Sequence, residues 1–151
     1  MALFKKLFGK SEKENSSKGF HSLTVTKVSK IGRDTVKIEF SVPDNIKKDF
    51  AFIPGQYINF SIDIKGVNYR RSYSICSGPE EQLAVAVKKV KKGIISTWFN
   101  SEVQDGTQIL ASKPEGNFIL PKNASKIVAI AAGSGITPIV SIAKSIEDTK
   151  G

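Results

Sequence analysis

Residues 58–65 alternate strictly between apolar and polar side chains, a pattern that predicts a β-strand with one apolar and one polar face. The same period of two recurs around residues 23–28, 36–40 and 83–87. Turn-forming residues separate these segments, at Ile53-Pro54-Gly55, Gly78-Pro79 and Asp105-Gly106. Strands with one polar face belong mainly to antiparallel sheets, so the sequence predicts five or six short strands that close as a small barrel or sandwich of about 100 residues.

The C-terminal part has a different pattern. Residues 127–132 (IVAIAA) form a continuous apolar run, which predicts a strand buried on both faces of a parallel sheet. The turn at 133–138 (GSGITP) follows, and apolar residues then recur at helical spacing, with Thr137 as the expected N-cap and Pro138 at the first helical position. A strand, a glycine turn and a helix open a doubly wound nucleotide-binding domain. Since only one such unit is present, we expect the chain to be a fragment.

Charge and cysteine content limit the chemistry of the 151 residues. Lys and Arg number 23 against 14 Asp and Glu, and the net charge of +9 favours polyanionic partners or phosphorylated cofactors. One cysteine, Cys76, and one histidine, His21, supply neither an intrachain disulfide nor the four cysteines of an iron–sulfur site. The lysines at 88–92 form one short cluster without a nucleic-acid-reading motif, so nucleic acid is not the expected partner.

Residues 1–18 combine a short apolar and basic stretch with a polar segment, which predicts a disordered tail. The alternative is an amphipathic helix that docks weakly on an anionic membrane through Leu3, Phe4, Leu7 and Phe8. No apolar run approaches the roughly 20 residues of a membrane span, so we expect no transmembrane segment and a cytoplasmic location.

Three segments carry residues suited to binding a phosphorylated, aromatic ligand. Arg71 and Tyr73 point to one face of an extended backbone, about 7 Å apart, where a guanidinium can bind phosphate beside an aromatic ring. The segment 88–96 joins lysines to Gly93 and to a helix expected to start near Ser96, and helix N-termini bind anions. The glycines of 133–138 allow a diphosphate to approach the backbone. The alternatives are an ordinary exposed strand, a solvated turn and a plain tight connection.

In this order the segments resemble the FAD-binding half of the ferredoxin–NADP reductase superfamily, and within it the phenylacetyl-CoA epoxidase-type reductases of phenylacetate degradation. The resemblance covers about residue 20 to the end of the chain. It rests on five motifs: Pro54-Gly55-Gln56-Tyr57, Arg71-Ser72-Tyr73-Ser74-Ile75-Cys76-Ser77, the segment from Val87 and Lys88 through Gly93 and Ser96, Pro114-Glu115-Gly116-Asn117-Phe118, and Ala132-Gly133-Ser134-Gly135-Ile136-Thr137-Pro138.

The resemblance implies a mainly β protein: a tail at 1–18, a six-stranded antiparallel β-barrel that binds FAD at 19–121, and the first βα unit of an α/β NAD(P)-binding domain at 122–151. It also implies an FAD-dependent oxidoreductase that passes electrons from NAD(P)H to a 2Fe-2S ferredoxin domain or an oxygenase component, with the metal cluster outside this chain. Alone, the truncated chain is expected to be poorly active. The alternatives are a non-catalytic FAD-binding or docking module, or the reductase of another oxygenase or a flavohaemoglobin-like system.

Site residues follow from the same resemblance. Arg71, with Ser72 beside it, is expected to bind the FAD diphosphate, while Tyr73 packs against the isoalloxazine ring and Ser74 places its hydroxyl near the flavin N5. Tyr73 and Ser74 are therefore the expected catalytic residues. The other implied contacts are Val87, Lys88 and Thr137 with the flavin, Gly93, Ile95 and Ser96 with its diphosphate, and Gly133, Ser134 and Gly135 with the diphosphate of the nicotinamide nucleotide.

Overall fold

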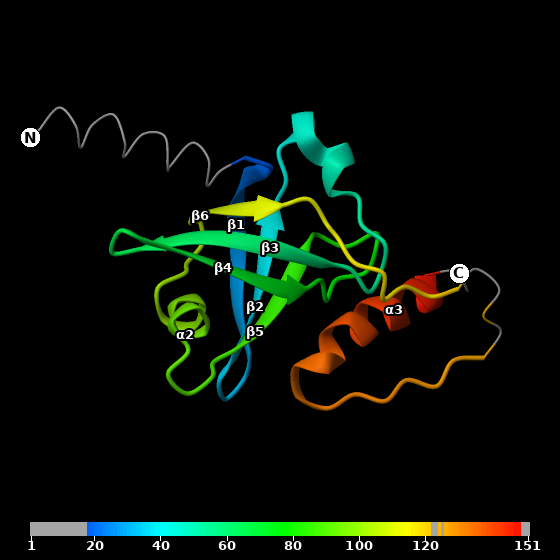
Figure 1. Ribbon diagram of the computed structural model, residues 1–151. Coiled ribbons are helices and arrows are strands. Elements are labelled where there is room, and N and C mark those ends of the chain that lie inside the picture. Colours follow the sequence, from blue (N-terminus) through cyan, green and yellow to red (C-terminus); the bar gives the residue numbers. More distant parts are fainter. Residues whose placement is uncertain (1–17, 122–123, 125, 149–151) are drawn as a thin grey trace, which may run out of the picture.

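The computed structural model describes residues 18–121, 124 and 126–148 (Figure 1). The described chain contains an antiparallel sheet of six strands in the order β4-β3-β6-β1-β2-β5. The strands are β1 (Phe20–Gly32), β2 (Thr35–Ser41), β3 (Tyr57–Ile64), β4 (Val67–Ser74), β5 (Ala84–Lys88) and β6 (Gln108–Ser112). The helical segments are η1 (Asp44–Phe50), α2 (Ile94–Ser101), η2 (Gly133–Gly135) and α3 (Ile136–Asp148). The predicted antiparallel, mainly β architecture is confirmed.

The sheet curls toward a barrel but is not closed by a continuous ladder. Its edge strands β4 and β5 approach each other, and just beyond β4 an isolated bridge pairs Ile75 with Val85. The Cys76 backbone N–H also donates to the Ala84 carbonyl oxygen at 2.9 Å. The gap between β4 and β5 therefore stays open along most of β4.

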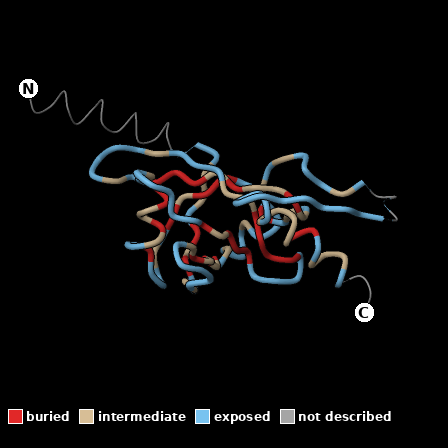
Figure 2. Tube along the Cα trace, turned by 90° about the horizontal axis from the view of Figure 1, so that it is seen from below, coloured by how far each residue is buried: buried red, intermediate tan, exposed pale blue. Residues whose placement is uncertain are grey.

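Buried apolar side chains of the strands and of α2 form one core. Figure 2 marks the buried stretches of the chain in red. Phe40 and Phe60 stack at 5.4 Å between ring centroids, and Phe99 of α2 meets Phe60 edge-on at 5.6 Å. In β1 the apolar spacing lengthens from two to three residues between Val25 and Val28. The pairing register with β2 shifts there, so a bulge keeps Val28 packed against the core.

Residues 127–132 do not form the predicted strand. Val128 is 90% and Ile130 92% exposed, although both are strongly apolar. A parallel strand needs neighbouring strands that pair with it and cover its faces, and none of the described residues does so. The predicted helix is present as α3, but it begins at Ile136. Thr137 is thus inside the helix, not its N-cap, and its hydroxyl donates to the Ser134 carbonyl oxygen at 2.8 Å.

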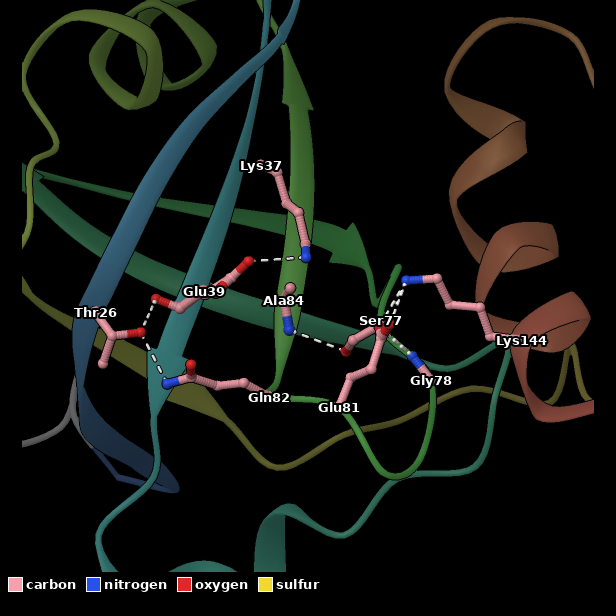
Figure 3. A network of polar contacts seen from close by, with 9 residues as sticks. All are labelled: Thr26, Lys37, Glu39, Ser77, Gly78, Glu81, Gln82, Ala84 and Lys144. Carbon is pink, nitrogen blue, oxygen red and sulfur yellow. Dashed lines mark hydrogen bonds and ion pairs between the residues drawn. The ribbon is translucent and has the colours of Figure 1, made fainter. Parts of the chain in front are cut away.

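Helix α3 is fastened to the sheet domain at the Gly78-Pro79 turn. The Ser141 hydroxyl donates to the Ser77 carbonyl oxygen at 2.7 Å, in a fully buried contact. One turn further on, Lys144 forms an ion pair of 2.6 Å with Glu81, which also accepts the Gly78 backbone N–H (Figure 3). These contacts hold α3 against the turn that follows β4.

No helix among the described residues is long and apolar enough to cross a membrane. The expected tail at 1–18 lies almost wholly outside the described residues.

Candidate functional site

A pocket of about 610 Å³ lies between the end of β4, the segment from β5 into α2, and the start of α3. Every site residue expected from the sequence lines it except Val87 and Gly135. Its walls consist of Arg71, Ser72, Tyr73, Ser74, Ala86, Lys88, Val90, Lys92, Gly93, Ile94, Ile95, Ser96, Gly133, Ser134 and Thr137. Three separate segments of the chain therefore meet at one site.

Strand β4 carries Arg71 and Tyr73 on the same side, as its period of two predicts. In the register with β3, Arg71 lies opposite Phe60 and Tyr73 opposite Ile58. The Tyr73 ring is half-buried and meets Phe99 edge-on at 5.3 Å, so the core holds its orientation. Burial raises the pKa of the Tyr73 phenol, which the Arg71 charge opposes more weakly, so the phenol is uncharged at neutral pH.

The two serines that flank Tyr73 differ in their surroundings. The Ser72 hydroxyl donates a hydrogen bond to Asn59 Oδ1 on β3, at 2.5 Å. Ser74 ends β4, is half-buried and lies opposite Tyr57. The Ser72 hydroxyl is thus held by the sheet while Ser74 borders the pocket beside the Tyr73 ring.

The segment from β5 to α2 forms the second wall. Helix α2 begins at Ile94 with Gly93 as its N-cap, two residues before the expected start. The Ser96 hydroxyl accepts the Val90 backbone N–H at 3.2 Å and donates to the Gly93 carbonyl oxygen at 3.3 Å, which folds the loop onto the first turn of the helix. A Cβ at Gly93 would overlap the Ser96 hydroxyl and a Val90 methyl group, so this close approach requires glycine.

The pocket is suited to a phosphate-bearing ligand. Arg71, Lys88 and Lys92 line it, and no aspartate or glutamate does so among the residues that the structure describes. The first N–H groups of α2 have no partner within the helix and point out of its N-terminus, where they carry partial positive charge. Guanidinium, ammonium and helix N–H groups together are a donor set for a diphosphate.

Val87 is fully buried in the core, whereas its neighbours Ala86 and Lys88 line the pocket. The sequence of β5 already contained this signal, since the larger apolar side chains, Val85 and Val87, alternate with smaller or polar ones and are buried. Sequence reasoning also missed Val90, Lys92 and Ile94 as lining residues. Gly135 belongs to η2 but does not line the pocket.

Residues 22–119 match the family model described as oxidoreductase FAD-binding domain. The chain is 39% identical over 127 residues to a component of 1,2-phenylacetyl-CoA epoxidase from Escherichia coli (strain K12). It is 35% identical over 127 residues to the ferredoxin reductase component of 3-ketosteroid-9-alpha-monooxygenase from Rhodococcus rhodochrous. In both cases the match covers 82% of this chain and 36% of the relative.

A solved structure, phthalate dioxygenase reductase, has the same fold with a TM-score of 0.70 and 28% sequence identity. The match covers 87% of this chain and 41% of that one, which is described as a modular structure for electron transfer from pyridine nucleotides to [2Fe-2S]. The chain therefore spans well under half the length of these relatives.

Proposed function

The chain belongs to the oxidoreductase FAD-binding domain family, and from this premise we propose that its pocket between β4, α2 and α3 binds FAD in an NAD(P)H-dependent electron-transfer reductase. The observation that carries the proposal is the meeting of Arg71, Tyr73 and the N-terminus of α2 in one cationic pocket. An aromatic ring beside a diphosphate donor set suits a flavin nucleotide.

Each wall of the pocket has a distinct role in this proposal. The Arg71 guanidinium and the first N–H groups of α2 hold the diphosphate, and Lys88 and Lys92 add positive charge beside it. Tyr73, held by Phe99, offers its ring to the isoalloxazine, and Ser74 presents its hydroxyl next to that ring. When bound, FAD supplies the step from two-electron donors to one-electron acceptors.

The nicotinamide nucleotide approaches from the side of α3. Gly133, Ser134 and Thr137 line the pocket there, and Ser141 and Lys144 fasten the helix to the sheet domain. We assign residues 19–121 to the FAD-binding domain and residues 122–151 to the start of an NAD(P)-binding domain, which agrees with the family match at 22–119.

The relatives' names support the kind of partner, since they include an oxygenase reductase component and a protein that passes electrons to [2Fe-2S]. We propose that the parent protein passes electrons to a 2Fe-2S ferredoxin domain or an oxygenase component, as in phenylacetate degradation. The 151 residues contain one cysteine, so the cluster is carried elsewhere. We propose a cytoplasmic location for this protein.

Fluorescence titration of the full chain with FAD tests this function. Wild type is expected to bind FAD saturably, and the Arg71→Ala, Tyr73→Ala double variant to lose binding by at least tenfold. The matched control is Arg70→Ala, which removes the same charge from the neighbouring residue. The Arg70 side chain contacts Phe20 and does not line the pocket. Absence of saturable FAD binding by the wild type, or unchanged affinity in the double variant, would contradict the proposal.

A further inference from the structure

A pocket of about 760 Å³ lies between the segment that follows β2 and the loop that leads into β5. Its walls come from residues 40–52, which include η1, and from residues 79–83, so we call it the η1 pocket. It shares no lining residue with the pocket at Arg71. The proposed function therefore leaves the η1 pocket without a role.

Apolar side chains form part of the wall of the η1 pocket. Phe50 and Leu83 are buried members of the core and line it. Val42 and Phe52 also line it, but they are only partly buried where they pack against the core. The pocket therefore keeps accessible apolar surface that can bind further apolar side chains.

The charge of the η1 pocket is opposite to that of the chain as a whole. Among the described residues that line it, Asp44, Glu80 and Glu81 carry carboxylates and Lys47 carries a positive charge. Glu81 is paired with Lys144, whereas Asp44 and Glu80 form no ion pair within the described chain. An acidic pocket with apolar surface is complementary to a ligand that is both basic and apolar.

Residues 1–10 (MALFKKLFGK) have this composition, although they lie outside the described part of the chain. Their larger apolar residues recur at the spacing of one helix face: Leu3, Phe4, Leu7 and Phe8. Their charged side chains are all positive: Lys5, Lys6 and Lys10. The same charge disfavours the pocket at Arg71, which is lined by cations.

The described chain begins next to the η1 pocket. His21, close to the start of β1, meets the Phe50 ring edge-on at 5.8 Å between centroids, and Phe50 lines the pocket. Figure 1 shows η1 near this end of β1. Residues 11–17 connect the basic segment to the described chain and span roughly 25 Å when extended. The pocket is within reach, and the covalent connection gives the segment an effective concentration on the order of a millimolar.

We propose that residues 1–10 dock into the η1 pocket, with their apolar side chains against Val42 and Phe52 and their lysines beside Asp44 and Glu80. The docked segment covers the loop at 79–83, which fastens α3 through the Glu81–Lys144 ion pair. It acts as an internal strap on that loop. The contact needs no flavin, so it is tested independently of the proposed function.

Paramagnetic relaxation enhancement on the full chain locates the segment. A nitroxide is attached at Ala2→Cys, and the chain without this substitution is the labelling control, because its one cysteine, Cys76, is buried. We expect the label to reduce the amide NMR intensities of residues 42–52 and 79–83 at least twofold. Residues 63–66, at the β3–β4 turn, should keep their intensities.

Substitutions in the segment test which side chains hold it. Adding Phe4→Ser and Leu7→Ser to the labelled chain should abolish the intensity loss at the η1 pocket, and neither change touches the described fold. The control pair Asn15→Ser and Ser16→Ala alters the connecting residues alone and should preserve the loss. A loss that survives the Phe4→Ser, Leu7→Ser pair, or one centred on the apolar residues 118–130, would overturn the proposal.

A charge reversal tests the acidic rim of the pocket. Glu80→Lys should reduce the intensity loss at least by half, and high salt should reduce it further. The matched control Glu102→Lys reverses an exposed carboxylate that does not line the η1 pocket and should leave the loss unchanged. Equal effects of the two reversals would contradict the proposal. So would a label that affects no pocket residue while the chain co-sediments with phosphatidylserine vesicles, since the segment would then bind membranes instead.

Discussion

The hydroxyl of Ser141 in α3 donates a 2.7 Å hydrogen bond to the backbone carbonyl oxygen of Ser77, and both residues are fully buried. The Ser77 hydroxyl in turn accepts the Ala84 backbone N–H at 3.0 Å, so this residue links α3 to the first residue of β5. The bond therefore holds the helix that borders the candidate nicotinamide side of the pocket against the sheet domain.

Ser141→Ala should loosen this attachment. The substitution leaves the Ser77 carbonyl oxygen buried without its donor, at an expected cost of about 1–3 kcal/mol in the free energy of unfolding. Hydrogen exchange of the α3 amides and urea unfolding measure the effect. The matched control is Ser145→Ala. The Ser145 hydroxyl donates to the Ile142 carbonyl oxygen of its own helix, so its removal should lower the free energy of unfolding much less. Equal effects of the two variants would contradict this role for Ser141.

The Glu81–Lys144 ion pair should contribute a small, pH-dependent stability. Lys144 and, more weakly, the Gly78 N–H lower the pKa of the Glu81 carboxyl. A lowered pKa means that the stabilisation is present above the ordinary glutamate pKa and is lost as the pH falls through the lowered value. Because the pair is partly exposed and screened by solvent, Glu81→Gln should cost at most about 1 kcal/mol at pH 7.

Urea unfolding of wild type and Glu81→Gln at pH 7 and at acidic pH checks this expectation. The difference between the two proteins should shrink as the pH falls below about 4, and it should also shrink in high salt. A difference that is constant across this range would show that the carboxylate charge is not responsible.

Replacement by alanine should destabilise the fold more at Gly55 than at Gly66. Both Gly55 and Gly66 have positive φ, 102° and 81°, but a Cβ at Gly55 would overlap the Phe118 carbonyl group, whereas at Gly66 it meets nothing within 4 Å. Gly66→Ala should cost about 1–2 kcal/mol from backbone strain alone. Gly55→Ala should cost about 1–3 kcal/mol more because of the overlap. Thermal unfolding of both variants measures the difference, and equal losses would rule out close approach as the reason for Gly55.

Gly93→Ala should weaken flavin binding. Its φ of −77° suits any residue, but the new Cβ would displace the Ser96 hydroxyl and Val90, which shape the loop at the N-terminus of α2. We expect at least a tenfold loss of FAD affinity by calorimetric titration. The control is Gly135→Ala, since a Cβ there meets nothing within 4 Å and Gly135 does not line the pocket. Unchanged FAD affinity in Gly93→Ala would contradict the role of this loop.

Much of the sheet was predictable because its signals are local. The alternation of β3 and β2 identifies the core residues Ile58, Phe60, Ile38 and Phe40, since period two depends only on the strand itself. The longer spacing between the apolar residues Val25 and Val28 corresponds to a β-bulge, which can be recognised only from the pairing of β1 with β2.

Features that depend on distant partners were not predictable in the same way. Residues 127–132 have the pattern of a strand, but a strand needs a neighbour, and the described chain provides none. Ser96 and Thr137 were expected near helix starts, yet their hydroxyls bond to Gly93 and Ser134 because each helix begins one or two residues earlier. The attachment of α3 by Ser141 arises from tertiary packing alone.

A crystal structure of the full chain grown with saturating FAD locates the flavin itself. We expect the diphosphate between Arg71 and the first turn of α2, with the isoalloxazine ring against Tyr73. A flavin bound on another surface, or a pocket that stays without flavin at saturating FAD, would contradict the assignment of this site.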